Sequence, residues 1–215
     1  KSKATLAGDR QLGECHYASF RPGTIDYTSH HQIIHTLIEA MENQKLCKLT
    51  YQALNAPRPK TFYIKPRKLF SRHDTIYLYA QKAKEPGKPY RAPKYDPLLA
   101  VHRIKAVVMT DTGFQPDHFD FEKSFNQQFG VIKDGAFQVE VEFRDWSASV
   151  VAERIWSPDQ KILKKGKDKI LLKFTASSEP ELISWLLSFG QDAKLIKPEH
   201  LIVRLTDIAG EMLKN

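Results

Sequence analysis

Hydrophobic and polar positions first follow a helical period and then alternate. A helix is predicted to begin at Thr28 or Ser29, with Ser29 as its N-cap, because five apolar positions then recur at helical spacing: Ile33, Ile34, Leu37, Ile38 and Met41. From residue 46 to 110 the period is two, and short strands are predicted over 47–51, 62–65, 68–70, 76–81, 98–104 and 106–110. So few short strands would leave exposed edges in an open sheet, which favours closure into a small barrel.

The second half of the chain begins a new pattern. Phe137 to Phe143 alternates strictly between apolar and polar residues, which predicts a strand. A helix over 146–155, a hairpin of 160–163 with 170–174, a helix opened by Pro180, a strand over 193–196 and a closing helix over 199–213 follow. The order β-α-β-β-α-β, with one helix added, is that of a ferredoxin-like domain. The predicted fold class is therefore α+β, with a small β-barrel followed by a ferredoxin-like domain.

These patterns divide the chain into four segments. Residues 1–29 are interpreted as a linker or the remnant of an upstream domain, and residues 30–113 as a helix plus the barrel. Residues 114–136 form a connector rich in phenylalanine, and residues 137–215 form the second domain.

Basic residues are concentrated in the first half. The chain holds 33 Lys and Arg against 25 Asp and Glu, a net charge of +8. Residues 45–105 hold 15 basic and three acidic residues, whereas residues 137–215 hold 12 of each. A segment of this composition attracts phosphates, anionic metabolites or acidic protein surfaces. A solvated basic face that serves only solubility explains the composition equally well.

Several other kinds of chemistry are disfavoured. No nucleophile has a local base and no Gly-rich phosphate loop is present, so no enzymatic activity and no cofactor are predicted. His31 and His35 have the i, i+4 spacing of a zinc motif, but Gln32 replaces its Glu, so surface histidines are the better interpretation and no metal is predicted. Cys15 and Cys47 are too few for a disulfide framework and no apolar run could span a membrane, so a cytoplasmic protein is expected.

The candidate binding residues are aromatic and cationic side chains on or near the predicted strands. Tyr77 and Tyr79 share the polar face of one strand, and Arg67, His102 and Arg103 lie within or close to strands. Guanidinium groups bind phosphate in a planar fork and tyrosines stack on bases, as in oligonucleotide recognition by small barrels. The tyrosines are equally consistent with half-buried strand residues, whereas Arg103 within an apolar run needs a partner.

Short motifs in a fixed order resemble two known domains. The stretches Leu49-Thr50-Tyr51, Ile64-Lys65-Pro66-Arg67-Lys68-Leu69, Ile76-Tyr77-Leu78 and Val101-His102-Arg103-Ile104 resemble a WYL domain. Residues 153–162, residues 185–190 and the closing helix resemble the WCX extension that follows many WYL domains. Two positions depart from the family pattern. Ile76 replaces the Trp, and Pro97 stands near the position of an expected Arg, so that one anion contact is either lost or supplied by Arg91 or Lys94 from the loop.

The resemblance implies an Sm/SH3-like barrel, a ferredoxin-like domain and a place in a bacterial transcriptional regulator. Such proteins are homodimers that sense nucleotides or nucleic acid through the barrel and bind promoter DNA through a winged helix-turn-helix, for which residues 1–28 are too short. Our hypothesis is an effector sensor that binds a nucleotide or single-stranded nucleic acid, and the alternative is a dimerisation module that docks an acidic partner. The ligand-binding residues would be Tyr51, Arg67, Tyr77, Tyr79, Arg91, His102 and Arg103.

Overall fold

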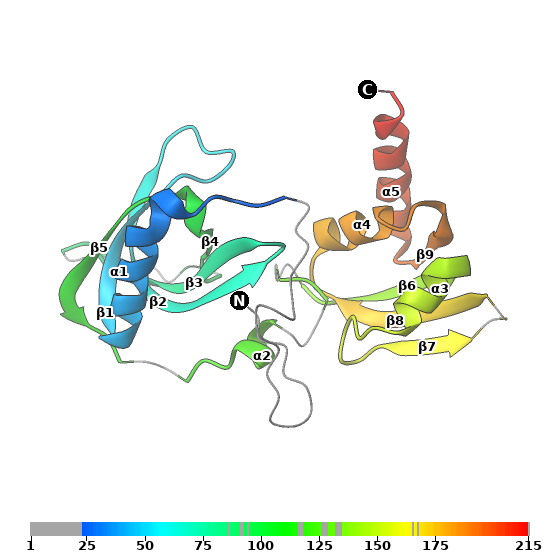
Figure 1. The fold of residues 1–215 in the computed structure, drawn as a ribbon, viewed down its shortest axis with the longest axis horizontal. Helices are drawn as coiled ribbons and strands as arrows, with labels where there is room; N and C mark the ends of the chain where they lie inside the picture. Colours follow the sequence, from blue (N-terminus) through cyan, green and yellow to red (C-terminus); the bar gives the residue numbers. More distant parts are fainter. Residues whose placement is uncertain are drawn as a thin grey trace, which may run out of the picture. The chain divides into compact units, whose positions relative to one another are not determined.

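The computed structural model describes residues 23–85, 87–90, 93, 95–115, 118–125, 129–131, 135–164, 166 and 168–214. The chain forms two compact units, residues 1–117 and 118–215. Each unit is built on one antiparallel sheet with helices beside it, so the fold is α+β (Figure 1).

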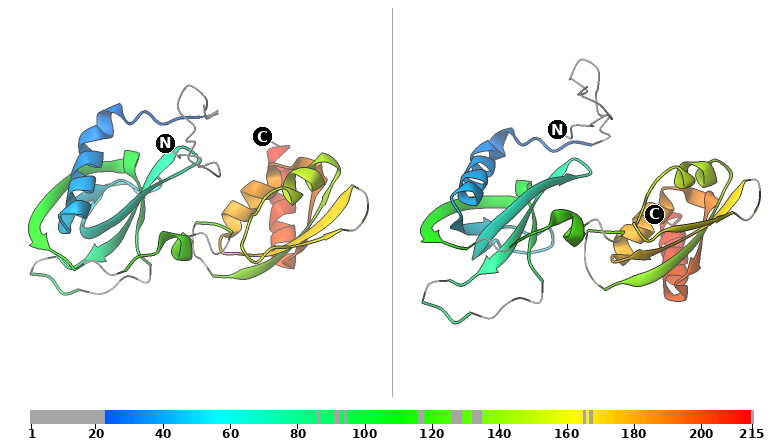
Figure 2. Two further views of the ribbon diagram at one scale, coloured as in Figure 1. Left: turned by 60° about the horizontal axis from the view of Figure 1, so that its bottom comes forward. Right: turned by 90° about the horizontal axis from the view of Figure 1, so that it is seen from below.

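The first unit consists of a helix followed by five strands. Its elements are η1 (Thr28–His30), α1 (His31–Glu42), β1 (Lys45–Tyr51), β2 (Lys60–Arg72), β3 (Thr75–Ala83), β4 (Leu98–Ala100), η2 (Val101–Arg103) and β5 (Ile104–Gly113). The sheet order is β4-β3-β2-β1-β5, so each strand pairs with its neighbour in that series. Both views of Figure 2 show α1 alongside the strands of this sheet.

The core of the first unit lies between α1 and one face of the sheet. Leu37 and Ala40 of α1 are fully buried against alternate residues of the strands: Cys47, Leu49, Ile64, Leu78, Ala80 and Ile104. The prediction of Ser29 as the N-cap is wrong, because a 3-10 turn precedes α1 and His30 occupies the cap position, where its side chain makes no hydrogen bond to the first turn of the helix. The carboxylate of Asp26 instead accepts hydrogen bonds from the backbone N–H (2.8 Å) and hydroxyl (2.6 Å) of Thr28.

Two of the predicted strand boundaries change in the structure. The runs 62–65 and 68–70 belong to one continuous strand, β2, with a bulge between Pro66 and Lys68 that leaves Arg67 as the extra residue. The run 98–104 is interrupted, because Val101–Arg103 form the 3-10 turn η2 between β4 and β5. The turn between β2 and β3 is confirmed: His73 and Asp74 both have positive φ (46° and 58°), as a tight two-residue hairpin requires.

The second unit contains a four-stranded sheet. Its elements are α2 (Phe121–Phe125), β6 (Phe137–Arg144), α3 (Asp145–Ala152), β7 (Lys161–Lys164), β8 (Lys169–Ala176), α4 (Glu179–Leu187), η3 (Gly190–Asp192), β9 (Ala193–Lys197) and α5 (Glu199–Met212). The sheet order is β7-β8-β6-β9, with every neighbouring pair antiparallel. Its core is formed by alternate residues of β6 and β8 with the buried faces of the helices, among them Val139, Val141, Phe143, Leu172, Phe174, Leu182 and Leu201.

Helix α3 is shorter than predicted. It ends at Ala152, and Ile155 is 85% exposed beyond it. The indole N–H of Trp156 donates to the Val151 carbonyl oxygen (3.0 Å), which turns the chain back onto the last turn of the helix.

Among the residues that the structure describes, no helix is long and apolar enough to cross a membrane.

Candidate ligand-binding site

Four of the predicted residues gather where β4 passes into η2. Tyr51 ends β1, and its hydroxyl accepts a hydrogen bond from the backbone N–H of Ala100 (3.3 Å). Ala100 is also the register partner of Tyr77 on β3, so Tyr77 joins this group through its backbone, while its side chain is on the face of β3 opposite the buried Leu78. His102 and Arg103 follow directly in η2, where the Arg103 carbonyl accepts from the backbone N–H of Gln52 (3.1 Å). We call this group, Tyr51, Tyr77, His102 and Arg103, the η2 corner.

Two further aromatic side chains pack at the η2 corner, although nothing in the sequence marked them. The His30 Nε2 donates to the carbonyl oxygen of His102 (3.1 Å). The ring of Tyr27 makes edge contacts with the rings of His30 (6.1 Å) and His102 (6.4 Å). The Tyr27 hydroxyl accepts from the backbone N–H of Ile76 (2.7 Å), and burial raises the pKa of that phenol. Tyr27 lies in the segment 1–29, which has no apolar periodicity to indicate packing, and the sequence therefore predicted a linker or remnant there.

Positive charge at the η2 corner is not neutralised from within the described part of the chain. There the guanidinium of Arg103 has no carboxylate partner, and Arg103 is hydrogen-bonded to Gln52 through its backbone carbonyl. The Nδ1 atom of His102 is buried and makes no hydrogen bond with any described residue. Burial, then the nearby Arg103 and His30, lower the pKa of His102. The corner therefore combines a permanent cation with a buried imidazole nitrogen that an anion could satisfy.

Arg67 and Tyr79 lie in a second group, on the sheet face opposite the core. The Arg67 guanidinium lies 5.8 Å from the ring centroid of Phe114, and the Lys65 ammonium lies 6.0 Å from the same ring. The Tyr79 hydroxyl donates to a carboxylate oxygen of Asp96 (3.0 Å). Burial, then the hydrogen bond and charge of Asp96, raise the pKa of Tyr79 to about 12. Tyr79 is therefore a neutral phenol whose proton is already donated within the protein.

The remaining candidates from the sequence have simple placements. His31 and His35 are exposed on α1 and its first turn, and no group of three or more metal-ligating side chains occurs among the described residues. Cys47 is fully buried in β1, and burial raises the pKa of its thiol to about 11, which makes it unreactive as a nucleophile. Arg91, the loop residue expected to contact an anion, lies outside the described residues, as does Cys15.

Comparisons with known proteins identify two domains. The WYL domain model matches residues 32–109, and the WCX domain model matches residues 135–213. The search of curated proteins found no significant match.

Solved structures add a likeness in fold. A structure described as a CRISPR Cas-related protein is 14% identical, with a TM-score of 0.53, and the match covers 85% of this chain and 50% of that one. Proteasome accessory factor B/C (PafBC) of Arthrobacter aurescens is also 14% identical, with a TM-score of 0.37 over 86% of this chain and 27% of that chain. The chain thus spans half or less of the length of each of these proteins.

Proposed function

Since the chain carries a WYL domain followed by a WCX domain, we propose that it is the effector-sensing portion of a transcriptional regulator. The effector would be a nucleotide or a single-stranded nucleic acid, bound by the WYL domain. In the complete regulator, a separate domain would bind promoter DNA, and the WCX domain would contribute to a homodimer.

The observation that carries this proposal is the unneutralised charge at the η2 corner. Arg103 lacks a carboxylate partner within the described chain, and the neighbouring His102 Nδ1 is buried without a hydrogen bond. A phosphate bound there would pair with the half-exposed guanidinium of Arg103, and a small movement of the His102 ring would let its Nδ1 donate to the same phosphate.

Each residue of the η2 corner has a proposed role that its surroundings allow. Arg103 would pair with the phosphate, and His102 would add a hydrogen bond. Tyr77, whose ring stacks on Phe70 (5.8 Å between centroids), would extend an aromatic surface for a base. The hydroxyl of Tyr51 is already bonded to Ala100, so this residue would position the corner rather than bind through its hydroxyl.

Two finer features of the architecture belong to the same proposal. Closure of the first sheet into an Sm/SH3-like barrel is supported by the Tyr51 hydroxyl, because it joins the end of β1 to β4 across the sheet. A ferredoxin-like second domain is supported by the sheet order β7-β8-β6-β9 and by the alternation of strands and helices along the chain.

The direct test measures binding of labelled single-stranded DNA and RNA oligonucleotides and of cyclic nucleotides at two salt concentrations. Affinity should fall steeply with salt, with a slope of about −0.7 per phosphate contact in a single strand. Arg103→Ala should weaken binding about tenfold and reduce the salt slope by about 0.7, because one phosphate contact is lost. Arg103→Lys keeps the charge and should retain part of the affinity.

The matched control is Lys194→Ala. Lys194 is an exposed lysine of β9, so this variant removes one positive charge from the second unit and changes no residue of the η2 corner. If Arg103→Ala and Lys194→Ala bind equally well, the assigned role of Arg103 is wrong. A chain that binds no nucleic acid or nucleotide but captures an acidic protein would replace the proposal with the interaction-module alternative.

A further inference from the structure

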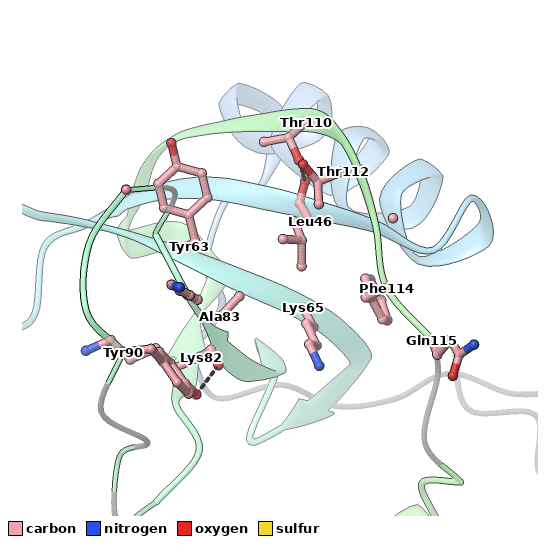
Figure 3. A pocket seen from close by; sticks show the side chains of 13 residues that line it. Leu46, Tyr63, Lys65, Lys82, Ala83, Tyr90, Thr110, Thr112, Phe114 and Gln115 are labelled. Carbon is pink, nitrogen blue, oxygen red and sulfur yellow. Dashed lines mark hydrogen bonds between the residues drawn. The ribbon is translucent and has the colours of Figure 1, made fainter.

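The first unit has a second concave site, formed by different residues from the η2 corner. It is a pocket of about 760 Å³ on the face of the sheet opposite the core (Figure 3). Its lining residues come from β1, β2, β3, β5 and the segments after β3 and β5, and none of the seven site residues predicted from the sequence is among them. The volume lies within the range typical of small-molecule sites.

The walls of the pocket are held in place by bonds within the protein. The Phe114 backbone N–H donates to the Gln44 carbonyl oxygen (2.9 Å), and the Thr110 hydroxyl donates to the Leu46 carbonyl oxygen (2.9 Å). On the other side, the Tyr90 hydroxyl donates to the Lys82 carbonyl oxygen (2.8 Å), which Figure 3 shows as a dashed line. These bonds join separate stretches of chain around the pocket and fix the positions of its walls.

The chemistry of the lining combines aromatic surface with positive charge. Tyr63, Tyr90 and Phe114 supply rings, and Figure 3 shows Lys65 between Ala83 and Phe114. Lys82 and Lys84 also line the pocket, whereas no lining residue is acidic. The loop residue Glu85 is close in sequence, but its carboxylate pairs with Lys88 (2.9 Å). Aromatic walls accept a flat apolar body, and an uncompensated ammonium accepts one anionic group.

We propose that this pocket binds a small, flat aromatic anion, with Lys65 pairing with the anionic group and Phe114 and Tyr63 packing against the ring system. The proposal does not depend on the η2 corner, because the two sites share no residue. A WYL unit with both sites would respond to two ligands, one at each site.

The test titrates the full chain with 2-naphthoate and, separately, with its neutral analogue 2-naphthamide. Calorimetry should give saturable binding of the carboxylate, with about tenfold weaker binding of the amide, because a charge-assisted contact contributes a factor of this size. Backbone amide shifts of Thr112 and Gly113 should report the same titration, because both residues line the pocket. Lys65→Met, which keeps most of the stem and removes the charge, should weaken naphthoate binding about tenfold and leave naphthamide unchanged.

Two variants act as controls. Lys105→Met removes an exposed lysine of β5 that does not line the pocket, and it should bind naphthoate like the wild type. Arg103→Ala should also leave naphthoate binding unchanged, which separates this proposal from the η2 corner. The proposal is overturned by binding that does not saturate, by equal affinities for the carboxylate and the amide, or by equal losses in Lys65→Met and Lys105→Met.

Discussion

Leu78 is the residue whose truncation tests the packing of the first unit most directly. It lies in the middle of β3, between register partners Leu69 on β2 and Leu99 on β4, and it is fully buried. Its side chain belongs to the core that also contains Leu37 and Ala40 of α1. Leu78→Ala therefore removes three carbon atoms from a position enclosed by strands and covered by a helix.

The expected cost is about 3 kcal/mol of unfolding free energy. Leucine-to-alanine substitutions in cores cost about 2–5 kcal/mol, the sum of lost transfer free energy and the cavity that remains. Strands on both sides and the helix above restrict collapse of the site, which places Leu78 away from the low end of that range. For a unit of this size, the melting temperature should fall by roughly 12–24 °C, because each kcal/mol lowers it by about 4–8 °C.

The assay benefits from the distribution of tryptophan. All three tryptophans, Trp146, Trp156 and Trp185, lie in the second unit. Urea unfolding followed by tryptophan fluorescence therefore reports the second unit, and tyrosine absorbance and the amide signals of β1–β5 report the first. Leu78→Ala should lower the urea midpoint measured by tyrosine absorbance and by the amide signals of β1–β5. The midpoint measured by tryptophan fluorescence should stay nearly unchanged.

The matched control is Leu54→Ala in the same unit. Leu54 follows β1 and is 74% exposed, so its truncation should change the unfolding free energy by less than about 0.5 kcal/mol. If the losses of unfolding free energy in Leu78→Ala and Leu54→Ala differ by less than about 1 kcal/mol, the inference that Leu78 is a central core residue is refuted.

Three further predictions concern single groups in the first unit. Tyr27→Phe should lower the unfolding free energy of the unit by about 1–3 kcal/mol, because the Ile76 N–H loses its acceptor. Chemical denaturation measures this loss, and an unchanged unfolding free energy would contradict the role of the bond. Folding lowers the pKa of His102, so the unfolded chain takes up a proton at this residue more readily than the folded chain. The stability of the unit should therefore be highest above the ordinary histidine pKa and should decrease as the pH falls toward the pKa of His102 in the folded state. His102→Asn should abolish this decrease in a pH series of melting curves. In a Cys15→Ser background, Cys47 should react with a thiol reagent at pH 8 only after unfolding, and rapid modification of the native chain would contradict its burial.

Local patterns predicted those elements whose residues contact their own neighbours. The alternation of Cys47, Leu49 and Tyr51 predicted β1, and the strict alternation from Phe137 to Phe143 predicted β6, because period two places one set of side chains in the core. Pro180 near the start of α4 marked that helix, because its missing N–H costs nothing in the first turn. The family resemblance was confirmed by matches to both domains in the order predicted.

The candidate site depended on contacts that no local pattern encodes. His30 and His102 are 72 positions apart, and they meet only because η1 and η2 lie side by side in the folded unit. The bulge at Arg67 arises from the register between β2 and β3, which a single strand cannot specify. For the same reason the pocket beside Phe114 was not predicted, since its lining comes from separate strands and the segments that follow them.

The sequence by itself determined the class of fold, the order of the elements, the excess of positive charge in the first half and the identity of the two domains. Only the tertiary structure decided which charges remain unpaired and which rings share a surface. Periodicity and composition are properties of neighbouring residues, whereas a binding site is formed by side chains that strand register and helix packing bring together from distant positions.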